Sequence, residues 1–158
     1  MPMTEAMSPM IRLARLEDTD ALANLAGQLG YPSTVEQIRR RFEVLMEKSD
    51  ENAVFVAEAN GKILGWVHVH IYSLLVDDPE TEIGGLVVDE AARGQRIGEE
   101  LMQAAEAWTL EKGCSSVYLR SNVIRTHAHE FYKRIGYSVI KSQYAFRKKL
   151  KEQSTNLR

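Results

Sequence analysis

The sequence predicts an α/β fold in which a mixed central sheet of about seven strands carries helices on both faces. Short β-branched runs alternate with segments whose apolar residues recur at helical spacing. The dipeptide Asn60-Gly61, between two such runs, is typical of a two-residue hairpin. Helices between successive strands imply right-handed crossovers, which lay them over the faces of the sheet. The predicted order is β-α-α-β-β-β-α-β-α-β-β.

Length and composition indicate one globular domain. The chain has 158 residues, of which 44% are hydrophobic and 27% charged, with a net charge of −2. We expect a single domain over residues 10–148, with flexible polar ends at 1–9 and 149–158. The charge balance gives no case for a nucleic-acid partner, and no apolar run is long enough for a membrane span. The N-terminus lacks a signal-peptide pattern, and a single cysteine, Cys114, favours a cytoplasmic location.

The first quarter of the chain reads as a strand followed by two helices. Residues 10–13 alternate weakly as a strand, and Asp18 or Thr19 begins a helix that Gly30 ends. The segment 33–36 has the spacing of a capping box, which predicts the start of a second helix. The apolar face of this second helix consists of Val35, Ile38, Phe42 and Leu45.

Three strands are predicted next, over residues 53–59, 63–72 and 81–88, with a loop at 77–79. His68 and His70 lie two residues apart and therefore share one face of the sheet. No motif supplies a third ligand, so we expect a structural or acceptor-pocket role rather than a metal site. Gly84-Gly85 interrupts the third strand, which indicates either a bulge or tight packing against a helix.

The rest of the chain continues the alternation. A strand is predicted over 116–121, then a helix over 126–135 that Gly136 ends, and finally two strands over 137–140 and 144–147.

The stretch from Glu82 to Leu101 reads as strand, short turn and helix, and its turn suits a phosphate. The first N–H groups of a helix have no partner within the helix, and the helix dipole adds positive charge there. Glycines at 94 and 98 allow close approach to the main chain, and Arg93 and Arg96 supply charge. The turn fits neither the dinucleotide fingerprint nor the P-loop. The turn therefore has two interpretations. It binds a pyrophosphate, or it is simply a helix start with solvated arginines.

Two motifs together resemble the GNAT family of N-acetyltransferases. Residues 93–98 resemble the acetyl-coenzyme A signature Gln/Arg-x-x-Gly-x-Gly/Ala after a strand, with Arg93 first, Arg96 in place of the usual middle glycine, and Gly98 last. Residues 128–137 resemble the family's Ala-x-x-Phe-Tyr-x-x-x-Gly-Phe/Tyr block. The resemblance covers residues 10–148.

The resemblance implies that the fourth and fifth strands are parallel and splay apart, and that acetyl-CoA enters the gap as cosubstrate. It implies pantetheine pairing along the edge of the fourth strand and an oxyanion contact from the Val88 N–H. The family often has an asparagine three residues before the alanine; here that position is Arg125, and Asn122 lies nearby. The cofactor-binding residues implied are Leu86, Val87, Val88, Arg93, Gly94, Gln95, Arg96, Ile97, Gly98, Glu99, Asn122, Arg125 and Tyr132.

The chemistry implied is direct acetyl transfer to a primary amine in a ternary complex. An alkyl ammonium, with a pKa of about 10, must lose a proton before it attacks. Glu82 is the first choice of base, on the same face as Gly84 and Leu86 if no bulge intervenes, and the two histidines are alternatives. Tyr132 matches the family tyrosine that protonates the leaving thiolate, although a buried phenol can also be plain packing.

The predicted function is therefore an acetyl-CoA-dependent N-acetyltransferase acting on a small-molecule amine. The alternatives are a protein or peptide amine as acceptor, and an acyl-CoA-binding sensor without turnover. A homodimer through the exposed edge of the last strand is a further expectation.

Overall fold

The computed structural model describes residues 8–152, which fall into two compact units, one up to Arg120 and one from Ser121 onward. Most of the two ends that we expect to be flexible lies outside the described residues. Each unit is described by itself.

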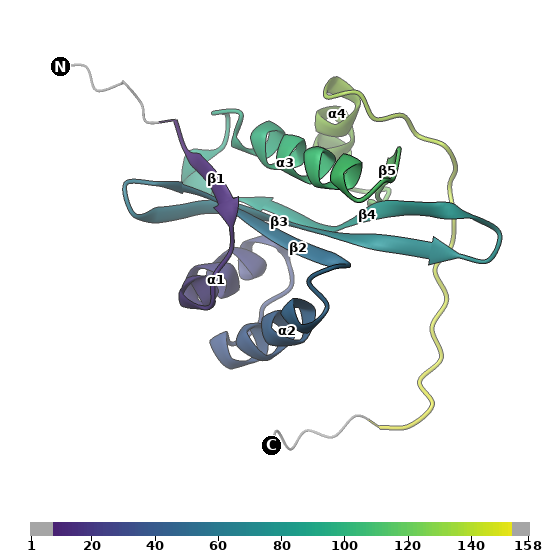
Figure 1. Cartoon of the computed structure of the whole chain (residues 1–158), viewed down its shortest axis with the longest axis horizontal. Coiled ribbons are helices and arrows are strands. Elements are labelled where there is room, and N and C mark those ends of the chain that lie inside the picture. Colours follow the sequence, from purple (N-terminus) through teal and green to yellow (C-terminus); the bar gives the residue numbers. More distant parts are fainter. Residues whose placement is uncertain (1–7, 153–158) are drawn as a thin grey trace. The chain divides into compact units, whose positions relative to one another are not determined.

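The first unit is a five-stranded sheet with its helices (Figure 1). The strands follow one another across the sheet in sequence order; β1 to β4 are antiparallel, and β5 joins β4 in parallel. The α/β class with a mixed sheet is thus confirmed. Its elements are β1 (Met10–Leu13), η1 (Leu16–Asp18), α1 (Thr19–Leu29), α2 (Val35–Glu47), β2 (Asn52–Ala59), β3 (Lys62–Leu74), β4 (Asp77–Val88), η2 (Glu90–Ala92), α3 (Ile97–Glu111) and β5 (Val117–Tyr118).

The sheet is covered on both faces, as predicted (Figure 1). On one face, Val54 and Val56 of β2 pack with Leu22 of α1 and Phe42 of α2, and Trp66 of β3 joins this cluster. On the other face lies α3, whose fully buried Leu101 approaches Gly65, the residue next to Trp66. Because neighbouring strand residues point to opposite faces, the sheet separates two apolar layers.

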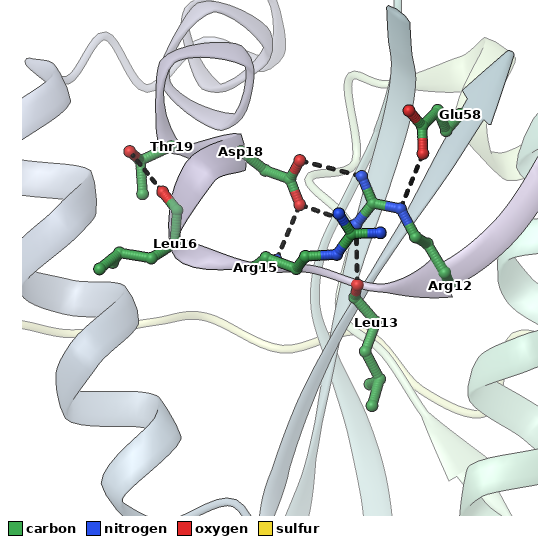
Figure 2. A network of polar contacts seen from close by, with 7 residues as sticks. All are labelled: Arg12, Leu13, Arg15, Leu16, Asp18, Thr19 and Glu58. Atoms are coloured by element: carbon green, nitrogen blue, oxygen red, sulfur yellow. Dashed lines mark hydrogen bonds and ion pairs between the residues drawn. The ribbon is translucent and has the colours of Figure 1, made fainter. Parts of the chain in front are cut away.

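A partly buried ion network joins the first strand to the start of α1 (Figure 2). The guanidinium of Arg12 donates to both oxygens of Asp18 and to Glu58 of β2, at 2.8–3.0 Å. Burial alone would raise the pKa of Asp18, but the bonds from Arg12 and from the Arg15 N–H lower it below its ordinary value. This network fixes β1 against β2 and against α1.

Several boundaries differ from the sequence prediction for identifiable reasons. The capping box of α2 is formed by Thr34 and Gln37, one residue later than predicted. The loop expected at 77–79 is wrong: these residues begin β4, and the turn of the hairpin is Leu75-Val76. Proline is tolerated at position 79 because β5 pairs with β4 only from Thr81 onward, so Pro79 lies at an edge.

The second unit contains α4 (Thr126–Arg134), which ends before Gly136 as predicted. The two strands expected at 137–140 and 144–147 are wrong: no residue of either segment is in a strand. Most of their apolar side chains are largely exposed, from 71% at Val139 to 93% at Phe146, and strand formation needs more burial than this. Over residues 8–152 the sheet therefore has five strands rather than about seven, and the dimer contact expected at the edge of the last strand loses its basis.

Candidate active site

A β-bulge in β4 shapes the middle of the sheet. His68 pairs with Gly85 and Val69 with Ile83, so Gly84 is the extra residue. A Cβ on Gly84 would come within 2.6 Å of His68 Nδ1, and one on Gly85 within 3.0 Å of the Trp66 ring. The bulge is confirmed, and the close packing at these two glycines is against side chains of β3 rather than against a helix. The bulge also places Leu86, opposite Val67, on the other face from Glu82, so the shared face that alternation without a bulge would give does not form.

Beyond the bulge, β4 turns main-chain groups toward its outer edge. The Asp89 N–H donates to the Leu64 carbonyl at 2.7 Å, toward β3. Because successive residues of a strand point their N–H groups to opposite sides, the Val88 N–H points away from β3. The Val88 carbonyl, on that same side, accepts a bond from Arg93 Nε at 3.3 Å. The edge from Leu86 to Val88 thus carries polar groups on the side where β5 diverges.

The turn after β4 presents helix donors at the surface. Gly94 and Arg96 both adopt left-handed conformations, with φ of 85° and 66°. The helical ladder of α3 begins with the Glu100 N–H donating to the Arg96 carbonyl, and no side chain caps this end. The N–H groups of Ile97, Gly98 and Glu99 therefore stand before the ladder, where an anion is favoured. Arg96 donates to Glu99 at 3.3 Å, which lessens the negative charge there.

Glu82, on the face of the sheet that α1 and α2 cover, lies at the centre of a charged cluster. The residue as a whole is 5% exposed, and both of its carboxylate oxygens are engaged. His70 Nε2 lies 3.1 Å from Oε1, and Arg120 Nε donates to Oε2 at 2.9 Å. His70 Nδ1 lies 3.1 Å from the Ile71 carbonyl, so both ring nitrogens face acceptors. Both can donate together only in the imidazolium form.

His68, beside this cluster, is kept neutral. Burial and, secondarily, the charge of His70 lower the pKa of His68 to about 4. Nε2 of His68 lies 3.0 Å from Asn52 Oδ1, an acceptor, which assigns the ring proton to Nε2. Nδ1 is then an unprotonated acceptor that faces the bulge at Gly84. The two histidines do share one face, as predicted, with ring centroids 5.4 Å apart.

Two tyrosines extend this face toward the hairpin tip. Tyr72 of β3 and Tyr118 of β5 stack in parallel, with centroids 5.4 Å apart and an interplanar angle of 1°. Tyr118 pairs with Glu82 across the parallel ladder, so the stack adjoins the charged cluster.

The second unit holds the other predicted site residues. The Asn122 carbonyl accepts from the Arg125 N–H at 3.0 Å and lies 2.9 Å from His129 Nε2, which ties the loop to α4. Tyr132 is partly buried between Phe131 and Tyr137, and burial raises the pKa of its phenol, an effect that Arg125 opposes.

Sequence reasoning missed Arg120 as a site residue. Arg120 lies two residues after Tyr118 and contacts Glu82 across the strands. Strand alternation from Tyr118 was the available signal, but it becomes useful only when Glu82 and Tyr118 are known to be paired.

Among residues 8–152, no three or more His, Cys, Asp or Glu side chains are grouped so as to hold a metal ion. Within the same residues, no helix has the length and apolarity that a membrane crossing requires.

Comparison with known proteins agrees with this geometry. Residues 17–137 match the model of the acetyltransferase (GNAT) family. An aminoalkylphosphonate N-acetyltransferase of Salmonella typhimurium is 32% identical over 142 residues, which cover 89% of this chain and 90% of the relative.

Solved structures share the fold. Glucosamine-6-phosphate N-acetyltransferase from Arabidopsis thaliana superposes with a TM-score of 0.77 at 26% identity, covering 89% of this chain and 98% of that one. The aminoglycoside N-acetyltransferase AAC(6')-Iy, in complex with CoA, gives a TM-score of 0.82 at 19% identity, covering 93% and 99%.

Proposed function

Because the chain belongs to the acetyltransferase (GNAT) family, we propose that it transfers an acetyl group from acetyl-CoA to the primary amine of a small molecule, directly within a ternary complex. The observation that carries this proposal is the strand–turn–helix at β4 and α3. Two sets of main-chain donors lie along this short stretch of chain. The N–H groups of Ile97, Gly98 and Glu99 precede the first i→i−4 hydrogen bond of α3, and the Val88 N–H points away from β3. Together they suit a diphosphate at one end and a thioester carbonyl at the other.

In this proposal, acetyl-CoA lies along the outer edge of β4. The amides of pantetheine pair with the main chain of Leu86, Val87 and Val88, as an added strand would. The diphosphate binds the main chain from Gly94 to Glu99, with charge from Arg93 and Arg96. Asn122 and Arg125 supply further contacts from the loop before α4.

The acceptor amine loses its proton to the Glu82–His70 pair. The 3.1 Å contact between Glu82 Oε1 and His70 Nε2 supports this assignment, since a proton can be shared between the two groups. The neutral amine then attacks the thioester carbonyl. The Val88 N–H stabilises the negative charge that develops on the carbonyl oxygen in the tetrahedral intermediate.

Tyr132 acts as the acid in the second half of the reaction. As the C–S bond breaks, the phenol gives its proton to the coenzyme A thiolate. A phenol is protonated at neutral pH, and the burial that raises the pKa of Tyr132 leaves it so, which an acid requires before it acts.

The acceptor class rests on the relatives. An aminoalkylphosphonate N-acetyltransferase at 32% identity and an aminoglycoside N(6')-acetyltransferase at 28% identity are both named for small-molecule amines. A peptide amine remains the alternative, because another relative is an N-alpha-acetyltransferase at 32% identity. The single buried cysteine, Cys114, supports a cytoplasmic site of action.

The test is to incubate the purified protein with acetyl-CoA and a panel of small amines, while following free thiol and identifying the product by mass. We expect thiol release that depends on the amine, and an acetylated amine as product. Glu82→Gln should abolish most of the amine-dependent thiol release, whereas Glu43→Gln, at an exposed glutamate of α2, is the control and should not. Binding of coenzyme A without thiol release above background would favour the sensor and refute the transferase.

A further inference from the structure

Resting on the proposed function, we propose that the acceptor is an amine that also carries an anionic group, and that Arg120 binds this group. The relevant groups are carboxylate, phosphate, phosphonate and sulfonate, which share the geometry that a guanidinium recognises.

The three residues of the charged cluster differ in their exposure to solvent. The side chain of Glu82 is 7% exposed, that of His70 28%, and that of Arg120 64%. The carboxylate therefore lies behind its two partners. A molecule that approaches this face of the sheet thus meets the guanidinium of Arg120 before the carboxylate of Glu82.

The side chain of Arg120 is held by one of its nitrogens and leaves the others available. Its Nε donates to Glu82 Oε2 at 2.9 Å, and Glu82 is its one partner among the described residues. A guanidinium has five N–H donors, so the four on its terminal nitrogens remain for a ligand. An arginine anchored through Nε to a buried carboxylate has already lost rotamer freedom, which lowers the entropy cost of binding an anion.

Arg120 lies on the same face of the sheet as the two histidines. Tyr118 pairs with Glu82 in the parallel ladder, so Arg120, two residues on, points to the same face as Tyr118. The unprotonated Nδ1 of His68 faces the same bulge at Gly84. A neutral acceptor for an amine N–H and a fixed cation for an anion thus lie on one face, with the Tyr72–Tyr118 stack beside them. This arrangement selects a short molecule with both groups.

The test uses two amines of matched shape. In 2-aminoethylphosphonate the amine is joined through two carbons to a tetrahedral anion; in 3,3-dimethylbutylamine it is joined through two carbons to a neutral tert-butyl group. Binding of each to the protein with coenzyme A is measured by calorimetry, without acetyl transfer. We expect the phosphonate to bind at least about tenfold more tightly than the neutral amine. Taurine and β-alanine show whether sulfonate and carboxylate are also accepted.

Arg120→Gln should remove this preference while leaving the affinities for the neutral amine and for coenzyme A unchanged. Unchanged coenzyme A binding also shows that the variant is folded. Arg40→Gln, at an exposed arginine of α2, is the matched control and should keep the preference. Arg120→Lys should retain part of the preference, since lysine keeps the positive charge but lacks the forked N–H donors of a guanidinium.

Three results would overturn the inference: equal binding of the two amines, no binding of the phosphonate, or an Arg120→Gln variant that weakens both amines or coenzyme A alike. These are distinguishable from failure of the proposed function. Thiol release with neutral amines as good as with anionic ones refutes the inference and leaves the transferase standing, whereas absent thiol release refutes the transferase.

Discussion

Nδ1 of His68 lies where the side chain of residue 84 would otherwise begin, 2.6 Å from an ideal Cβ on Gly84. The imidazole is held in place from its other nitrogen by Asn52, at 3.0 Å. The glycine of the bulge therefore makes room for a side chain of the neighbouring strand, and each residue limits what the other position can hold.

Gly84→Ala should lower the free energy of unfolding by about 1–3 kcal/mol, because the methyl group displaces the His68 ring. Urea unfolding of the purified variants measures this. Gly27→Ala is the control: this helical glycine has φ < 0 and nothing within 4 Å of its Cβ, and it should gain about 0.5–1 kcal/mol. If Gly84→Ala is as stable as the parent protein, the contact with His68 is not restrictive. Adding His68→Ala should recover part of the loss.

His68 should make stability depend on pH between about 4 and 6.5. Its pKa in the folded protein is about 4, below the ordinary 6.5, so in this window the unfolded chain binds the extra proton. Stability should therefore be complete above pH 6.5 and fall, by up to about 3 kcal/mol, as the pH drops to 4.

His68→Gln provides the comparison. It removes this titration and leaves the acidic groups, Asp18 among them, in both proteins, so their contributions cancel. Unfolding curves at pH 4.5, 5.5, 6.5 and 7.5 should show the variant gaining relative to the parent protein toward low pH. A difference that stays constant with pH would mean that His68 titrates normally.

Arg96→Gly should raise the free energy of unfolding by up to about 1 kcal/mol, since Arg96 adopts φ 66°, ψ 17°, a conformation that costs a residue with a Cβ about 1–2 kcal/mol. Its bond to Glu99 is exposed and contributes little. The same substitution in the middle of α2, Arg40→Gly, should have the opposite sign and cost about 1 kcal/mol. Thermal or urea unfolding decides, and a loss at position 96 equal to that at position 40 would contradict the prediction.

Tyr132→Phe should lower kcat by about 10²-fold or more with little change in coenzyme A affinity, because it removes the proposed proton donor and keeps the packing. Steady-state thiol release and calorimetric titration separate the two effects. Tyr144→Phe, at a tyrosine that is 90% exposed, should leave both unchanged. Full activity of the Tyr132→Phe variant would assign Tyr132 to packing alone.

Local signals in the sequence predicted most of the elements. Gly30 ends α1 with φ 106°, and Asn60 and Gly61 form the hairpin with φ 54° and 76°. These features depend on a few neighbouring residues, whose backbone preferences are strong. The turn at Leu75-Val76 gave no such signal, because both residues are apolar, and the Asp77-Asp78-Pro79 run beside it resembles a turn more closely.

Within the site, the sequence predicted single residues better than their contacts. The bulge followed from two adjacent glycines, and the turn before α3 from its composition. The engagement of Glu82 by Arg120 did not follow, because it depends on the register between two parallel strands joined through a whole helix. A bulge also reverses alternation, so the facing of Leu86 relative to Glu82 depended on whether a bulge formed between them.

The parallel ladder between β4 and β5 consists of two residue pairs, Thr81 with Val117 and Glu82 with Tyr118. Such a brief seam opens at low cost, so amide hydrogens of Val117 and Tyr118 should exchange with solvent well before those at the centre of β3. In the proposed function, substitutions that lengthen this pairing would make the sheet more rigid and would also narrow the entrance for acetyl-CoA. Rigidity of the sheet and turnover of the proposed enzyme are thus opposed at the pairing of β4 with β5.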